Sequence, residues 1–461
     1  MSENRDLGTG SIGKLLVNLA FPAITAQIIN LLYNMVDRMY IGHIPGIGSD
    51  ALTGVGVSFP IIMIISAFAS LVGMGGAPRA SIRMGKGDRP GAQQILGNCV
   101  TVLTVLSVVL TAVILIFREQ FLMMFGASRD TIGYGMQYLT IYALGTIFVQ
   151  YALGLNMFIT CQGFAKISML TVVIGAVLNI ILDPIFIFAF DMDVQGAALA
   201  TIISQGVSAF WVMKFLLGKK TTLKIEKKDL WPQAKVVMPV LALGVSPFIM
   251  QSTESLLFIC LNSSLQKFGG DIAVGAMTIL SSIMQFVMMP IQGLTQGAQP
   301  IISYNYGAGK IDRVWKAFRL LLISAMGFSV LIWLGVMLGP KLFASMFTND
   351  QTLIDYAAWA IRIYFAMGLV LGAQLACQQT FIALGNAKIS VFLAIFRKII
   401  LLIPLIFIFP LLMEDKVFAV FLAEPVADTI AAATTVTMFA ISFRKLLKKY
   451  EPADLAAGAK E

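Results

Sequence analysis

Twelve long apolar runs, separated by short polar segments, set the pattern of this sequence. Two windows without charge, 100–117 and 320–340, are each long enough for most of a bilayer crossing at about 1.5 Å per residue. The pattern predicts an all-α polytopic membrane protein. We predict that its twelve membrane-spanning segments lie at residues 15–39, 52–78, 93–117, 131–160, 167–190, 194–217, 236–262, 272–302, 315–339, 351–383, 389–413 and 417–442.

The composition agrees with this pattern. Of 461 residues 58% are hydrophobic and only 12% are charged, whereas soluble domains average about 25% charged residues. The start, MSENRDLGTGSIG, lacks the apolar core of a cleavable signal peptide, so the first helix is expected to be retained. Four cysteines stand singly in apolar segments and indicate neither a disulfide framework nor a zinc site.

The net charge of +9 is distributed in a way that predicts topology. If the N-terminus lies inside, most Lys and Arg fall in cytoplasmic segments, as the positive-inside rule requires. An even number of spans then places both termini in the cytoplasm of a cell-membrane protein. The basic excess therefore sets topology, and a nucleic-acid partner is excluded. The external segments hold only Arg38, Arg118, Arg129, Lys267, Lys341 and Lys416.

An internal repeat divides the chain into two halves. The sequence GFAKISM at 163–169 recurs as GNAKISV at 385–391, and the two copies begin 222 residues apart. We predict an N-terminal six-helix lobe at 1–218, a cytoplasmic linker at 219–235, a C-terminal lobe at 236–447 and a cytoplasmic tail at 448–461. Copies with an even number of spans run in the same direction and flank a central cleft, which is the usual scaffold for alternating access in transporters.

Polar side chains within the N-terminal lobe are the first candidate site, because ionisable residues are costly inside a membrane. Asp183 lies in the outer half of its predicted helix, Asn179 lies one turn away on the same face, and Thr201 reaches a similar depth. Asp37 ends the first predicted helix near the outer surface. Asp37 could instead pair with Arg38 at the interface, and Asp183 could be a satisfied aspartate beside a proline kink.

This cluster suits a proton carrier, because two nearby carboxylates in a medium of low dielectric cannot both stay charged at low cost. Pro184 lacks an N–H and frees carbonyl groups in the preceding turn, and Pro22 gives the first helix a place to bend. We predict Pro22 and Pro184 as hinges.

The C-terminal lobe carries different charges. Leu405 occupies the repeat position of Asp183, whereas Glu254, Glu424 and Asp428 lie at other places in the predicted helices. Two cations, Arg397 and Lys398, lie within the eleventh predicted span; they either extend to the cytoplasmic face or pair with a nearby acid.

Several kinds of chemistry have no motif in this chain. The single histidine excludes a two-histidine metalloprotease motif, and no P-loop, nucleophile elbow or CxxC is present. An ion gradient is therefore the expected energy source, and no cofactor or metal is predicted. Catalysis within the membrane has no support from these residues.

The set of motifs FPAI (21–24), VDRMYIG (36–42), NIILDPIFIF (179–188) and GAALATIIS (196–204), with a glutamate in the seventh span, resembles the multidrug and toxic compound extrusion (MATE) family, in its bacterial MepA-like branch. The similarity runs from about residue 14 to 447. It implies two six-helix lobes that export organic cations and dyes in exchange for protons or sodium. The expected partners are small organic cations, protons or sodium, and membrane lipids, and a monomer is expected.

Carried over by position, the resemblance assigns cation coupling to Asp37, Asn179, Asp183 and Thr201. Gln374 stands in the tenth span without a neighbouring acid, which favours coupling through the N-terminal lobe. A lipid-linked oligosaccharide flippase of the same superfamily is the alternative, although its cleft would need a basic excess. The residues predicted to contact cargo are Glu254, Gln27, Asn34, Asn156 and Met288.

Overall fold

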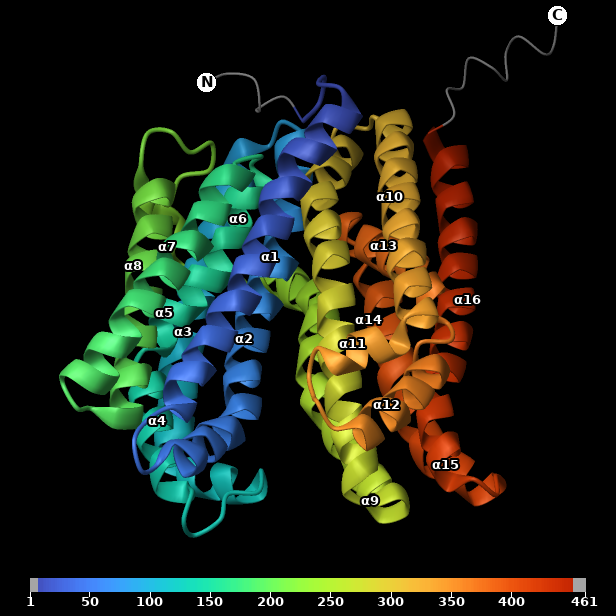
Figure 1. Cartoon of the computed structure of the whole chain (residues 1–461). Helices are drawn as coiled ribbons and strands as arrows, with labels where there is room; N and C mark the ends of the chain where they lie inside the picture. Colours follow the sequence, from blue (N-terminus) through green and yellow to red (C-terminus); the bar gives the residue numbers. More distant parts are fainter. Residues whose placement is uncertain (1–6, 451–461) are drawn as a thin grey trace, which may run out of the picture.

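The computed structural model describes residues 7–450, and describes side chains as far as residue 447. Helices make up all of the regular structure within these residues, so the predicted all-α class is confirmed. Most of the tail predicted at 448–461 lies outside the described residues. The described chain begins and ends on the same side of the molecule, which we call the terminal end; the opposite side is the distal end (Figure 1).

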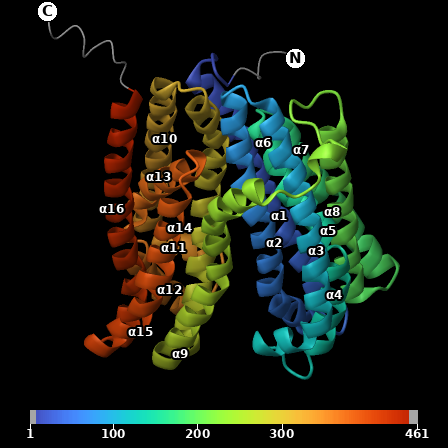
Figure 2. The same cartoon turned by 180° about the vertical axis from the view of Figure 1, so that it is seen from behind.

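The helices form two bundles side by side (Figures 1 and 2). The N-terminal bundle contains α1 (Ile12–Gly42), α2 (Gly48–Gly85), α3 (Arg89–Met124), α4 (Ile132–Leu144), α5 (Thr146–Gln150), η1 (Tyr151–Leu155), α6 (Asn156–Cys161), α7 (Ala165–Pro184), η2 (Ile185–Ala189) and α8 (Asp193–Leu217). The C-terminal bundle contains α9 (Ala234–Gly307), α10 (Ile311–Leu338), α11 (Pro340–Ser345), α12 (Gln351–Tyr364), η4 (Gly368–Val370), α13 (Leu371–Ala383), α14 (Ala387–Ile395), η5 (Phe396–Leu402), α15 (Ile403–Leu412) and α16 (Lys416–Tyr450). The short η3 (Lys227–Asp229) lies between them in sequence.

The predicted spans match these helices. Within residues 7–450, nine helices are long and apolar enough to cross a membrane, or up to eleven if each of two bent pairs forms one span. The pairs bend by 61° between α4 and α5 and by 52° between α12 and α13. The 74-residue α9 changes direction at Gly270, where φ is 66° and ψ is −161°, so it covers two of the predicted spans. With α9 counted twice, each of the twelve predicted spans has a matching helix or bent helix pair among the described residues.

Turns at matching positions of the two halves share one backbone conformation. Gly163 and Gly385 have φ of 89° and 73°, and Gly87 and Gly309 have φ of 79° and 72°. Each pair is separated by the 222-residue repeat found in the sequence. Glycine is favoured at these points because other residues rarely adopt positive φ.

Two buried amides attach the connection between the bundles to the N-terminal bundle. The Asn98 side chain on α3 donates to the carbonyls of Asp229 at 2.9 Å and Trp231 at 3.2 Å. The Gln162 side-chain oxygen, at the end of α6, accepts from the backbone N–H of Leu223 at 2.8 Å. The segment predicted as a linker is therefore held in place at the terminal end.

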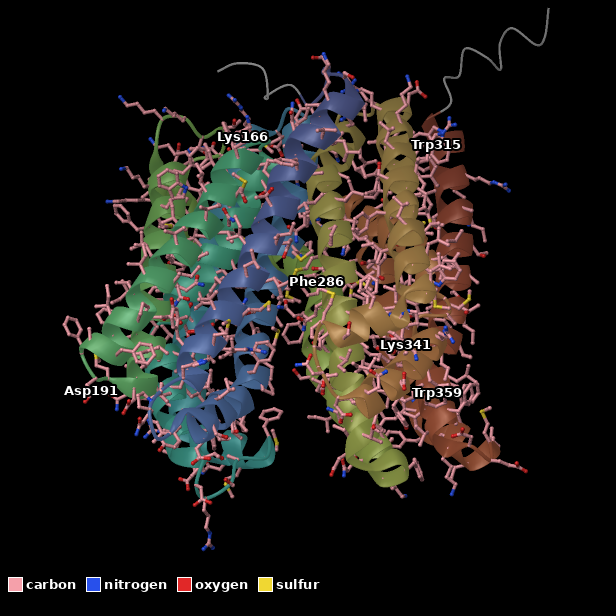
Figure 3. All side chains as sticks on the ribbon, in the orientation of Figure 1. Lys166, Asp191, Phe286, Trp315, Lys341 and Trp359 are labelled. Atoms are coloured by element: carbon pink, nitrogen blue, oxygen red, sulfur yellow. The ribbon has the colours of Figure 1, made fainter. Side chains whose placement is uncertain are left out.

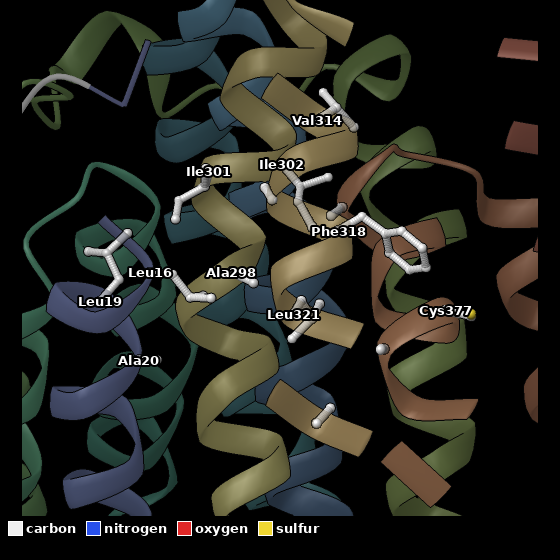
Figure 4. Packing of buried hydrophobic residues seen from close by; sticks show 14 of the residues in the cluster. Leu16, Leu19, Ala20, Ala298, Ile301, Ile302, Val314, Phe318, Leu321 and Cys377 are labelled. Carbon is white, nitrogen blue, oxygen red and sulfur yellow. The ribbon is translucent and has the colours of Figure 1, made fainter. Parts of the chain in front are cut away.

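A hydrophobic cluster joins the two bundles in their terminal halves. Side chains of α1 pack against α9 and α10, which belong to the other bundle (Figure 4). Its central members are all buried: Leu16, Leu19 and Ala20 of α1, Ala298, Ile301 and Ile302 of α9, and Val314, Phe318 and Leu321 of α10.

Glycines bring the backbones of the two bundles into contact at the same level. A Cβ atom added to Gly244 of α9 would lie 1.7 Å from the carbonyl oxygen of Leu71 on α2. One added to Gly307 would lie 2.0 Å from the carbonyl oxygen of Ile82. We call these contacts, together with the hydrophobic cluster above, the terminal seal.

Toward the distal end the bundles diverge (Figure 1). The side chains of Asn30 on α1 and Glu254 on α9 are exposed. Phe286 of α9 has an exposed fraction of 47% and lies midway between the two ends of the molecule (Figure 3). We call the region between the diverging bundles, beyond the terminal seal, the interbundle gap.

Candidate functional site

Three of the four predicted coupling residues form a hydrogen-bonded group inside the N-terminal bundle. The Asn179 amide nitrogen donates to Asp183 Oδ1 at 3.1 Å and to Thr201 Oγ1 at 3.3 Å. Asn179 and Asp183 meet because they lie four residues apart on α7. Asp183 is 0% exposed, and Asn179 and Thr201 are 1% and 8% exposed.

Asp37, the fourth predicted coupling residue, completes this cluster. Its carboxyl group lies within hydrogen-bonding reach of the Asp183 carboxyl group. Two ionised carboxylates have no proton to donate to each other, so this contact is favourable when the pair shares one proton. Asp37 Oδ1 and Asp183 Oδ2 are both buried and have no other hydrogen-bond partner.

The alternative pairing of Asp37 with Arg38 is absent from the described residues. The Arg38 guanidinium instead lies 4.8 Å from the ring centroid of Phe59 on α2, in a cation–π contact. Asp37 therefore faces the interior of the bundle.

The two predicted hinges differ in their local structure. Pro184 is the last residue of α7, and a π-helical turn, η2, follows it directly. Such turns widen a helix and are frequent at functional sites. Pro22 lies inside α1, which continues as one helix from residue 12 to 42. Bending at either proline stays a prediction.

Two tyrosines near the carboxyl pair were missed by the sequence analysis. Tyr138 on α4 is 4% exposed and is hydrogen-bonded to Thr201. Tyr33, one turn before Asp37 on α1, interacts electrostatically with both Asp37 and Asp183. The four-residue spacing of Tyr33 and Asp37 was the available signal for Tyr33.

The residues predicted to contact cargo lie in different surroundings. Asn156 is 8% exposed and lies inside the N-terminal bundle. Its side-chain nitrogen donates a hydrogen bond to the carbonyl oxygen of Ser168, and its side-chain oxygen accepts one from the Thr171 hydroxyl, both on α7. Asn34 donates to the carbonyl of Asn30 at 2.6 Å. Met288 packs against the cluster of the terminal seal. Three of these residues, Gln27, Asn34 and Met288, are partly exposed, whereas Glu254 is exposed.

A buried charge network lies in the C-terminal bundle. Arg397 of η5 contacts Asp428 Oδ1 at 2.7 Å and Glu424 Oε1 at 3.3 Å, both on α16. These side chains are 14%, 4% and 7% exposed in that order. Of the two roles considered for Arg397, the geometry supports pairing with acids, because its guanidinium contacts both carboxyl groups.

The neighbouring Lys398 pairs with a different helix. Its ammonium donates to Glu254 Oε1 and, at 2.6 Å, to the carbonyl oxygen of Met250, both on α9. Gln374 of α13 is 3% exposed, and its side-chain oxygen has no hydrogen-bond partner. The sequence analysis named each of these charged residues but could not assign their pairing.

Removal of the Arg397 charge is expected to destabilise the protein. Arg397→Met would leave Glu424 and Asp428 buried without a cation, which costs about 3 kcal/mol in comparable networks. We expect a clearly lower Tm for the purified protein in detergent. The matched control is Lys341→Met, since Lys341 pairs with Asp355 at 2.7 Å on the surface with side-chain exposures of 67% and 51%. An equal fall in Tm for both variants would contradict a special role for Arg397.

Comparisons with known proteins give the family of this chain. The chain is 25% identical to the multidrug export protein MepA of Staphylococcus haemolyticus (strain JCSC1435) over 424 residues, which is 91% of this chain and 92% of that protein. It is 25% identical to MepA of Staphylococcus aureus (strain N315) over 395 residues, 86% of each chain.

The fold matches solved structures over almost its full length. A MATE transporter in a bent conformation superposes with a TM-score of 0.91 at 23% identity, covering 98% of this chain and 100% of that one. A multidrug resistance MATE family transporter described as outward-facing gives a TM-score of 0.90 at 23% identity, covering 97% and 99%. The MatE family model matches residues 22–185 and again residues 247–408, once in each bundle. The chain therefore belongs to the MatE family of membrane transporters.

Proposed function

We propose that this protein exports organic cations across the cell membrane in exchange for protons, by alternating access between its two bundles. The observation that supports the proposal is the close approach of the Asp37 and Asp183 carboxyl groups, each with a buried oxygen, since such a pair is favourable when it shares one proton. The names of the MepA relatives support a multidrug cargo. We take both chain termini to face the cytoplasm, so the interbundle gap would open to the outside of the cell. One chain contains both bundles, so we propose that the protein works as a monomer.

The donor pattern of the cluster favours a proton over sodium as the coupling ion. A carboxylate only accepts hydrogen bonds, so the Asn179 NH₂ must face Asp183. The same NH₂ faces Thr201. In this orientation the Asn179 side chain offers Asp183 and Thr201 its NH₂ group and not its oxygen, whereas a metal cation requires oxygen ligands.

The charges that border the interbundle gap favour cationic cargo over an oligosaccharide pyrophosphate. Glu254 is exposed there, whereas Arg397 and Lys398 are held by acids or by a carbonyl and are largely buried. A pyrophosphate group would require accessible cations. The gap thus gives the flippase alternative less support.

The test uses the purified full chain in proteoliposomes with a fluorescent cationic dye such as ethidium. We expect an imposed pH gradient to drive dye transport and an imposed sodium gradient at constant pH to leave it at the level of empty liposomes. Dye transport driven by sodium alone would contradict proton coupling. Transport of neither kind would contradict the function itself.

A further inference from the structure

Two adjacent cations on a π-helical segment point in different directions within the C-terminal bundle. Arg397 and Lys398 both belong to η5, yet Arg397 contacts α16 and Lys398 contacts α9. Arg397 has two acidic partners, and Lys398 has one. The segment therefore connects the buried acids of α16 with the carboxyl group of Glu254.

The pair of Lys398 and Glu254 is asymmetric in its exposure. The Lys398 side chain is 4% exposed, whereas the Glu254 side chain is 65% exposed. The ammonium also donates to the Met250 carbonyl oxygen at 2.6 Å, so it keeps one partner if Glu254 turns away. A cation arriving through the interbundle gap can thus reach the carboxylate without first displacing the lysine from its buried position.

The formal charges of this network do not cancel. Counted as formal charges, the carboxyl groups of Glu254, Glu424 and Asp428 outnumber the two cations, Arg397 and Lys398. The Lys398 charge also acts on Glu424 of α16. Release of Lys398 from Glu254 would therefore leave the ammonium near a second acid.

We propose that Lys398 is a tethered counter-ion that occupies Glu254 when the gap is empty and is replaced there by one monovalent organic cation. This inference rests on the proposed function only in taking the cargo to be cationic. Lys398 is then a competitor of cargo within the protein. It lowers the affinity for cargo and so favours release, and it keeps the exposed carboxylate paired between transport cycles.

The test measures binding of tetraphenylphosphonium to the purified full chain. We expect Lys398→Met to lower the Kd about tenfold, because the carboxylate loses its internal competitor. The variant should fold, since the carboxylate that it leaves without a partner is exposed to solvent. Lys341→Met, at the surface pair with Asp355, is the matched control and should bind as wild type does.

The second arm asks whether Lys398 acts through Glu254. We expect Glu254→Gln to raise the Kd about tenfold, and Lys398→Met to have no further effect in that background. An unchanged or weaker affinity in the single Lys398→Met variant would overturn the inference, and so would tighter binding in the double variant. A wild-type protein that fails to bind the probe would contradict cationic cargo itself, and the inference with it.

Discussion

Replacing Asp183 with Asn is expected to abolish dye transport driven by a pH gradient. The substitution preserves the size of the side chain and its contact with Asn179, which can reorient to donate or accept. It removes the shared proton, because an amide cannot bind one at neutral pH. Asp37 is then left without its carboxyl partner. We expect transport in proteoliposomes to fall at least tenfold, to the level of empty liposomes.

Binding of cargo should survive this change, because Glu254 lies in the other bundle. Tetraphenylphosphonium should bind Asp183→Asn with nearly the wild-type Kd, so that coupling is lost while the cargo site remains. Asp271→Asn is the control, since Asp271 is exposed and bonds Gln266 at 2.9 Å. If Asp183→Asn transports dye across a pH gradient as well as wild type, the proposed coupling mechanism is wrong.

The sequence alone was sufficient to predict the helical spans and part of the candidate site, because both depend on the spacing of residues close together in the chain. Apolar runs predict the helices, and the four-residue step from Asn179 to Asp183 predicts their contact. Most helices extend beyond the predicted spans; α2, predicted at 52–78, runs from 48 to 85. Helix hydrogen bonds continue past the apolar region into polar segments, where hydropathy gives no signal.

Contacts between distant segments could not be derived in this way. Lys398 and Glu254 are separated by 144 residues, and no periodicity relates them. The π-helical turns η2, which follows Pro184, and η5, which contains the charged pair, have no signal in the pattern of apolar residues. Tyr138 reaches Thr201 only because α4 and α8 are neighbours in the folded bundle.

A methyl group added at the terminal seal is expected to stop transport by a different route. A Cβ atom on Gly307 would lie 2.0 Å from the backbone oxygen of Ile82, and one on Gly244 would lie 1.7 Å from that of Leu71. Backbone cannot rotate away as a side chain does, so α2 and α9 must separate. We expect Gly307→Ala and Gly244→Ala to lower dye transport more than tenfold, because overpacking of this kind disfavours the sealed state.

The position of the clash separates this effect from general misfolding. Gly307 meets α2 of the opposite bundle, so the core within each bundle is unchanged. Ser81 is 0% exposed in the seal and donates to the Pro300 carbonyl oxygen of the other bundle at 3.4 Å. A cysteine placed there by Ser81→Cys should resist a water-soluble maleimide in the otherwise wild-type protein and react when Gly307→Ala is added.

Gly327→Ala on α10 is the matched control, since a Cβ atom at Gly327 meets nothing within 4 Å. It should leave both maleimide protection and transport unchanged. A Gly307→Ala protein that transports normally and still protects the cysteine would show that the bundles need not meet here. Because the contact involves backbone on both sides, no side-chain change in Ile82 should restore the seal. The sealed state thus requires the close approach of α2 and α9, and a single added methyl group is enough to test this requirement.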